Sequence, residues 1–160
     1  MKRLYGLYEI APHIDDPNTY DLKRDYAFLR QDGLLIISAK GTHVNGASIP
    51  LVFWPFLGSP LSGTNKLWSC CHDSLYAKTA IIIDTNTLKH ITIQEAFDNW
   101  RDIPSEHFIH QTSFRRKFAD QTLLEAMRYL GVNLIKRRLV YRAVRIFGRA
   151  HWTQRTERAD

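Results

Sequence analysis

The stretch YAFLRQDGLLII, residues 26–37, sets two apolar runs on either side of Asp32-Gly33. An Asp-Gly pair between apolar runs is typical of a tight turn, because glycine readily adopts the backbone conformation that such a turn needs. The sequence therefore predicts an antiparallel β hairpin. Working outward, the strand pattern extends over the region from Tyr20 to Ser48.

Three helices are expected to pack against this hairpin. Helical periodicity predicts them over about residues 65–79, 113–130 and 133–148. Gly131 is a plausible C-cap for the second. Before the first helix, residues 46–63 carry three prolines, which excludes a regular helix there. The fold class is therefore α+β, with a small N-terminal antiparallel β hairpin or sheet packed against three main helices.

Residues 80–104 leave two alternatives open. Ile81-Ile82-Ile83 and His90-Ile91-Thr92-Ile93 could pair as a short hairpin. Thr92 could instead cap a helix that runs through Glu95 to Trp100. That helix would end before Pro104, because the residue before a proline avoids helical geometry.

The size and composition of the chain favour one domain. A chain of 160 residues that is 44% hydrophobic can bury a single core, so we expect a globular domain over residues 1–152 and a polar, frayed tail over 153–160. No run of residues has the length of a membrane span or a signal peptide. The two cysteines, Cys70 and Cys71, are adjacent and cannot staple distant segments. Residence in the cytoplasm is the expectation.

The C-terminal part of the chain is strongly basic. Residues 115–160 contain 12 Lys or Arg and 4 Asp or Glu, a local charge of +8 within a total of +6. On the last helix the apolar side chains expected to be buried are Ile135, Leu139, Ala143, Val144 and Phe147. The cationic face is expected to consist of Lys136, Arg137, Arg138, Arg142 and Arg145. Such a face attracts nucleic acid, anionic lipid or an acidic protein, and the alternative is an ordinary solvated surface.

One candidate site lies around His72. In the stretch from Cys70 to Tyr76, His72 falls on the apolar stripe of its helix, one turn before Tyr76. Asp120 shares the apolar face of the second helix. A buried carboxylate needs a partner, so we expect Asp120 to bind His72 and to accept a hydrogen bond from Tyr76. This pairing would orient the imidazole and leave its other nitrogen free as a base, which makes His72, Asp120 and Tyr76 the candidate catalytic residues.

The neighbouring Asp73 is expected to point elsewhere. It lies about 100° around the helix from His72, so it should face a different surface, where its oxygens could ligate a metal. The alternative for His72, Asp120 and Tyr76 is a satisfied polar network that pins two helices together. From sequence alone, catalytic and structural networks look the same.

Other reactive side chains form no recognised pattern. Cys70 and Cys71 are interpreted as small packing residues, since no feature predicts a lowered thiol pKa. Ser48 lacks the glycine-flanked turn of a hydrolase nucleophile. The remaining histidines have no spacing known for zinc; they are His13, His43, His90, His107, His110 and His151.

Three segments together resemble a family. They are Gly41 to Pro50, His72-Asp73-Ser74-Leu75-Tyr76, and Ala119-Asp120 leading to Gly131 and to the stretch Tyr141–Arg145. Their order is similar to that in domain-of-unknown-function family 1353 of tailed phages and prophages, over approximately residues 25 to 150. Ala47-Ser48-Ile49-Pro50 and Trp54 match the pattern of the family. Asn45 occupies a position where the family has aspartate, so Asp73 and Asn45 are the candidate metal ligands that the resemblance implies.

Two looser similarities concern the site. The His-Asp-x-x-Tyr helix resembles that of secreted phospholipases A2, which implies roles of base, calcium ligand and hydrogen-bond donor for His72, Asp73 and Tyr76, with Asp120 as the partner of the histidine. The chain lacks the disulfides and the glycine-rich calcium loop of those enzymes. The set His43, His72, Asp73 and Asp120 also resembles the metal ligands of HD phosphohydrolases, although His43 falls on a strand.

Three classes of function follow as expectations. The first is a phage-encoded virion or assembly component, present in the host cytoplasm during infection or in the virion, with phage structural proteins or nucleic acid as partners and a homo-oligomer left open. The second is a small hydrolase of a phosphoester, lipid or cell-envelope ester that uses the His-Asp dyad, with calcium or zinc as candidate cofactors. The third is a host-directed binding protein that uses its cationic face.

Overall fold

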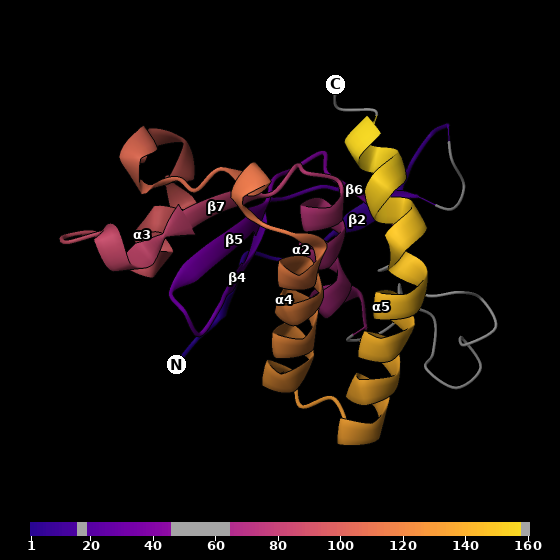
Figure 1. Cartoon of the computed structure of the whole chain (residues 1–160). Coiled ribbons are helices and arrows are strands. Elements are labelled where there is room, and N and C mark those ends of the chain that lie inside the picture. Colours follow the sequence, from indigo (N-terminus) through magenta and orange to yellow (C-terminus); the bar gives the residue numbers. More distant parts are fainter. Residues whose placement is uncertain (16–18, 46–64, 158–160) are drawn as a thin grey trace.

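The architecture is that of two antiparallel sheets beside a group of helices. The computed structural model describes residues 1–15, 19–45 and 65–157 (Figure 1). The larger sheet has the strand order β1-β4-β5-β7. Its strands are β1 (Leu4–Tyr5), β4 (Tyr26–Leu29), β5 (Leu34–Ser38) and β7 (Ile81–Asp84). The predicted α+β class is confirmed.

The predicted hairpin forms the centre of the larger sheet. Strands β4 and β5 pair antiparallel, with Phe28 opposite Ile36. Gly33 in the turn has a φ of 85°, a conformation that side chains other than glycine rarely adopt. A Cβ atom at this position would also collide with the side chain of Asn86. The turn chemistry in the sequence was therefore a reliable guide to this part of the sheet.

A smaller sheet joins three segments that are distant in sequence. Its strands are β2 (Ile10–Pro12), β3 (Tyr20–Leu22) and β6 (His43–Val44), in the order β2-β3-β6. All of its pairings are antiparallel. Because β6 also packs against the helix that carries His72, this sheet lies next to the candidate site.

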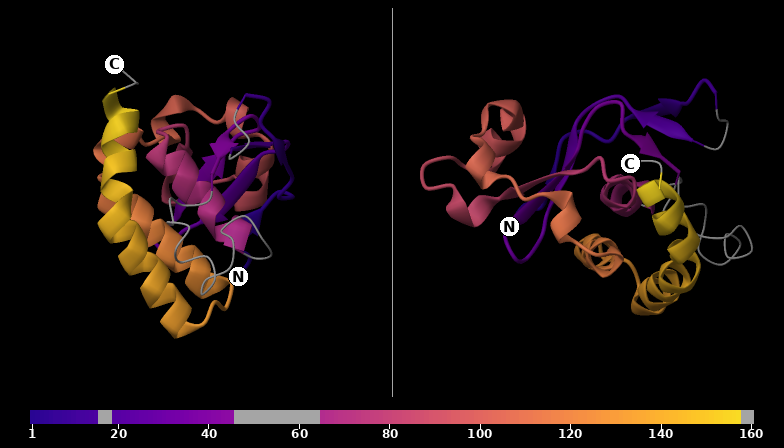
Figure 2. Two further views of the ribbon diagram at one scale, coloured as in Figure 1. Left: turned by 90° about the vertical axis from the view of Figure 1, so that its right-hand side faces the viewer. Right: turned by 45° about the horizontal axis from the view of Figure 1, so that its top comes forward.

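The three expected main helices are present as α2 (Asn65–Tyr76), α4 (Arg116–Tyr129) and α5 (Leu134–Glu157). Helix α2 packs on the sheets, α4 packs on α2, and α5 packs on both helices (Figure 2). Helix α2 ends earlier than predicted because Lys78 has a positive φ of 56°. Gly131, with a φ of 69°, separates α4 from α5, as predicted. No helix within the described ranges is long and apolar enough to cross a membrane.

The segment between β7 and α4 resolves the two alternatives. Ile81–Asp84 is a strand, but it pairs with β5, which excludes the alternative of a hairpin with residues 90–93. Thr92 instead caps α3 (Ile93–Asp98) through a capping box with Glu95. Short 3-10 turns fill the remainder of the segment, at Thr85–Thr87, Trp100–Asp102, Ser105–His107 and Gln111–Ser113.

Helix α5 differs from the prediction in its length and in its buried face. It continues to Glu157, so residues 153–157 are helical instead of a frayed tail. Ile135 and Leu139 were expected in the core, yet they are 69% and 48% exposed, and Phe147 is exposed too. The buried stripe consists of Val140, Ala143, Val144 and Gly148. The physical reason is close approach: a Cβ at Gly148 would meet the Tyr76 hydroxyl at 2.7 Å, so this face of α5 is the one that can pack on α2.

Candidate catalytic site

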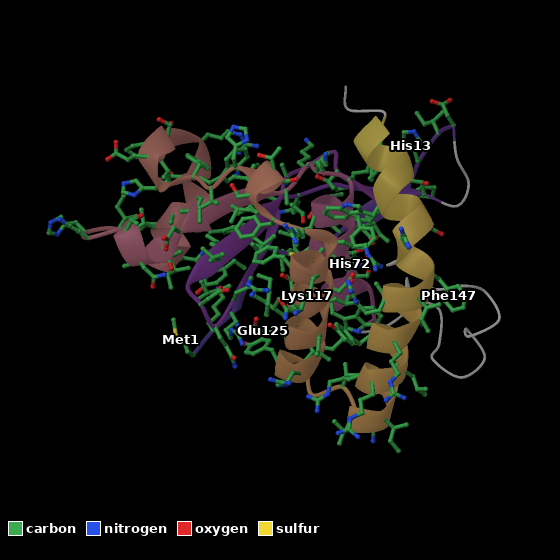
Figure 3. All side chains as sticks on the ribbon, in the orientation of Figure 1. Met1, His13, His72, Lys117, Glu125 and Phe147 are labelled. Carbon is green, nitrogen blue, oxygen red and sulfur yellow. The ribbon has the colours of Figure 1, made fainter. Side chains whose placement is uncertain are left out.

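His72, Tyr76 and Asp120 meet in the interior between α2 and α4. His72 and Tyr76 lie one turn apart on the buried face of α2, and Asp120 lies on the buried face of α4. The His72 ring and the Asp120 side chain are fully buried, and Figure 3 shows His72 in the interior of the molecule. Trp68, Leu75 and Met127 belong to the same apolar cluster. The site is thus held by packed helices, which fixes its geometry.

The predicted pairing of these three residues is confirmed. His72 Nε2 lies 3.3 Å from Asp120 Oδ1, and the Tyr76 hydroxyl donates to the same oxygen at 2.6 Å. The His72 and Tyr76 rings are in contact, with centroids 4.1 Å apart. Because Asp120 accepts a hydrogen bond from His72 Nε2, it favours the form of the imidazole that carries a proton on that nitrogen.

Two arginines complete the surroundings of Asp120. Arg145 Nη1 donates to Asp120 Oδ2 at 2.8 Å, and Arg116 Nη1 lies 3.9 Å from the same oxygen. Arg145 was predicted to belong to the outer cationic face, and this is wrong: its guanidinium turns inward because a buried carboxylate stabilises it. The four-residue spacing of Arg116 and Asp120 on one helix is a sequence signal that could have revealed Arg116.

Asp73 lies at the same site, contrary to the prediction of a different surface. It is buried, and its Oδ1 atom is 3.5 Å from His72 Nδ1. Its Oδ2 atom accepts from the backbone nitrogen of Asn45 at 3.1 Å, just after β6. The reason is that β6 covers this side of α2, so two adjacent faces of the helix are buried. The second nitrogen of His72, which was expected to be free, therefore faces a carboxylate.

The two carboxylates set the electrostatics of the histidine. Burial by itself lowers the pKa of His72, but the hydrogen bonds with Asp120 and Asp73 outweigh this effect and raise the pKa. Burial by itself raises the pKa of Asp120, and the bonds from His72, Tyr76 and Arg145 lower it below the ordinary value. Burial and the neighbouring Asp120 raise the pKa of Tyr76, so its hydroxyl stays protonated as a donor. These contacts favour a charged His72 beside an ionised Asp120.

Asn45 and Asp73 offer oxygen atoms for a cation. Asn45 Oδ1 is buried and makes no hydrogen bond in the part of the chain that the structure describes. A buried amide oxygen without a partner, on a residue whose backbone nitrogen contacts a carboxylate, is the type of donor that a hard cation such as calcium accepts. The pair thus fits a calcium ion in its chemistry, although it supplies fewer than the six to eight oxygens that calcium usually takes.

Several other predicted candidates are not part of this site. Cys70 and Cys71 are buried and free, and burial raises the pKa of the Cys71 thiol to about 12, so neither is an activated nucleophile. His43 binds Asp21 at 2.7 Å, so the described residues do not form the HD phosphohydrolase set. Ser48, the rest of Ala47–Pro50, and Trp54 lie outside the described residues.

Comparison with known proteins identifies a family without a known activity. A family described as "Protein of unknown function (DUF1353)" matches residues 20–144. "Uncharacterized protein y4jT" of Sinorhizobium fredii (strain NBRC 101917 / NGR234) is 39% identical over 74 residues, which covers 43% of this chain. The chain spans about a fifth of the length of that relative, since the match covers 22% of it. No solved structure matches the chain. The family model covers well over half of the sequence and includes every residue of the site except Arg145, so this chain belongs to the DUF1353 family.

Proposed function

We propose that this protein is a small hydrolase that cleaves an ester bond in a lipid, a phosphoester or a cell-envelope ester. The observation that carries the proposal is that Asp120 binds the Nε2 side of His72 while Tyr76 and Arg145 bind the same carboxylate. A histidine can act as a general base when a carboxylate orients it through one ring nitrogen and its second nitrogen points toward polar groups.

His72 would act through Nδ1. In the neutral form of the ring, with the Nε2 proton held on Asp120 and with Asp73 engaged by a cation, the lone pair would lie on Nδ1, which could accept a proton from an attacking water. Asp120 then stabilises the imidazolium, in keeping with its part in raising the pKa of His72. The same proton can pass from Nδ1 to the oxygen of the leaving alcohol. Each atom in this exchange comes from water, the ester or the His72 ring.

Asp73 and Asn45 would hold a divalent cation next to His72. Such an ion would supply positive charge that polarises the carbonyl or phosphoryl oxygen of the ester. Asp73 would then have two roles. Its carboxylate would hold the ion, and because it would no longer contact His72 Nδ1, that nitrogen would be free to act as the base. His72 is fully buried, so on this proposal a substrate would reach it past the contact between Asn45 and Asp73. We therefore place the entrance at the end of β6.

The first test measures hydrolysis and its need for a cation. The protein is incubated with phospholipid vesicles, aryl phosphoesters and aryl acyl esters, in calcium or in EDTA. We expect cleavage of one of these classes, and a loss of at least about 100-fold in EDTA and in Asp73→Asn, because charge stabilisation by a metal is worth several kcal/mol. Asp98→Asn is the matched control, since Asp98 is an exposed helical aspartate.

Two results would contradict this proposal. One is the absence of cleavage across all three classes of ester. The other is cleavage that Asp73→Asn and EDTA leave unchanged, which would remove both the cation and Asp73 from the reaction. A calcium titration followed by tryptophan fluorescence gives an independent reading, because binding at Asp73 and Asn45 does not depend on turnover.

A second candidate function is that of a virion or phage-assembly component, and the exposed face of α5 favours it. Ile135, Leu139 and Ile146 are exposed there, beside the exposed cations Arg138 and Arg142. Apolar side chains framed by positive charge suit docking on an acidic protein surface. The resemblance to proteins of tailed phages and prophages agrees with such a partner, and a host protein is the alternative.

Particle content tests this second function. Purified particles from an induced lysogen should contain the protein at a fixed copy number, and Ile135→Asp combined with Ile146→Asp should reduce it at least tenfold. Arg101→Asp, at an exposed position remote from α5, is the control. Absence from particles would rule this function out. Retention on DNA that weakens steeply with salt would point to nucleic acid as the partner instead.

A further inference from the structure

Three strands of the smaller sheet bring His13, Asp21 and His43 onto one face. Asp21 lies on the central strand β3, and His43 is its direct partner on β6. Ala11 is its partner on β2, and His13 follows two residues later, so its side chain points to the same face as that of Ala11. The backbone of His13 continues the pairing through a hydrogen bond to Thr19. Because side chains alternate between the two faces of a sheet along each strand, all three side chains lie on one face of the smaller sheet.

The side chains of His13, Asp21 and His43 lie close enough together to bind one metal ion. His13 Nδ1 lies 3.1 Å from both oxygens of Asp21, and His43 Nδ1 lies 2.7 Å from Asp21 Oδ1. One ligand atom from each residue lies within 4.8 Å of the others. Donor atoms on one tetrahedral zinc ion are about 3.3 Å apart, given metal–ligand bonds of about 2.0–2.1 Å. The two histidine–aspartate distances are within about 0.6 Å of this spacing, so the three side chains are already grouped as an ion would need them.

We propose that His13, Asp21 and His43 bind a divalent transition-metal ion, with zinc as the preferred ion. Two imidazoles and one carboxylate match the preference of zinc for nitrogen and oxygen ligands, whereas calcium and magnesium prefer sites made of oxygen alone. The described chain supplies three ligands, and water completes the coordination. The site is partly open, because the His43 side chain is 58% exposed.

This site is separate from the proposed catalytic centre. Figure 3 shows His13 well apart from His72, and both His13 and His43 bind Asp21, which is not one of the residues around His72. Asp21 lies on β3, His43 lies on β6 and His13 directly follows β2, so an ion would cross-link the end of β2 to β3 and β6. An ion that binds the folded chain and not the unfolded chain raises thermal stability. The inference does not rest on ester hydrolysis.

Zinc titration of the tag-free protein tests the site. Isothermal titration calorimetry should give one equivalent of zinc, and magnesium or calcium in excess should not displace it. His43→Asn, His13→Asn and Asp21→Asn should each weaken zinc binding at least 100-fold, since even residues that merely support metal ligands contribute about 10–100-fold. His90→Asn is the matched control, because His90 is an exposed histidine elsewhere on the surface.

Thermal unfolding provides the second reading. Zinc should raise the melting temperature of the wild type and of His90→Asn, and it should leave that of His43→Asn unchanged. Circular dichroism without metal checks that each variant is folded, and the exposed His43 is the position where replacement perturbs the fold least. Zinc binding of equal affinity in His43→Asn and wild type would overturn the proposal, as would the absence of binding at one equivalent.

Discussion

His72→Asn is expected to abolish most of the ester hydrolysis while the chain stays folded. General acid–base groups contribute about 10²–10⁴-fold to enzymatic rates, so we expect a loss of that size in kcat/KM. Asparagine can still donate a hydrogen bond to Asp120, which keeps that buried carboxylate paired. The measurement is the initial rate on the ester class that the wild type cleaves, in saturating calcium.

The Tyr76→Phe variant tests whether the hydrogen-bond network of His72, Tyr76 and Asp120 is catalytic or purely structural. The hydroxyl of Tyr76 touches Asp120 and not the reacting nitrogen of His72, so its loss should cost less activity than the loss of His72. Each variant removes or weakens a hydrogen bond of the buried network, so both should be destabilised to a similar extent, by about 1–3 kcal/mol. Equal activity losses that follow the unfolded fraction would mean that the network only holds α2 and α4 together.

The sequence was most informative where local chemistry determines structure. The turn at Asp32-Gly33 and the cap at Thr92 are set by neighbouring residues, and both appear in the structure. The contact between His72 and Asp120 was also predictable, because each residue lies on the apolar face of its own helix and a buried charge needs a partner. Helical spacing was sufficient to predict this part of the site.

Features that depend on how the helices and strands are arranged were not predictable. Asp73 is buried because β6 covers a second side of α2, and Arg145 turns inward because α5 packs through Gly148. His13 and His43 are 30 positions apart in sequence, and only the order of strands β2-β3-β6 brings them to Asp21. Spacing rules for metal sites detect ligands close in sequence, so they missed this set.

Asp120→Ala is expected to lower the free energy of unfolding by about 3 kcal/mol, the largest effect on stability among these variants. The substitution removes the acceptor shared by His72, Tyr76 and Arg145, and it leaves a charged histidine buried beside a tyrosine hydroxyl without a partner. Since Arg145 is about one-third exposed, water can replace its lost contact, which places the expected loss at the lower end for buried pairs. Urea unfolding at neutral pH measures the difference.

The pH dependence of this effect identifies its electrostatic part. Burial opposes ionisation of Asp120, yet its bonds to His72, Tyr76 and Arg145 lower its pKa below the ordinary value of 3.8 in the folded chain. A carboxyl group with a lowered pKa stabilises the fold above its unfolded-state pKa, and this contribution disappears as the pH falls through the folded-state value. The gap between wild type and Asp120→Ala should therefore be full at neutral pH and shrink in acid below about pH 3.8. Asp98→Ala, at an exposed helical position, should show neither effect, and a gap that persists unchanged in acid would mean that packing alone makes Asp120 important.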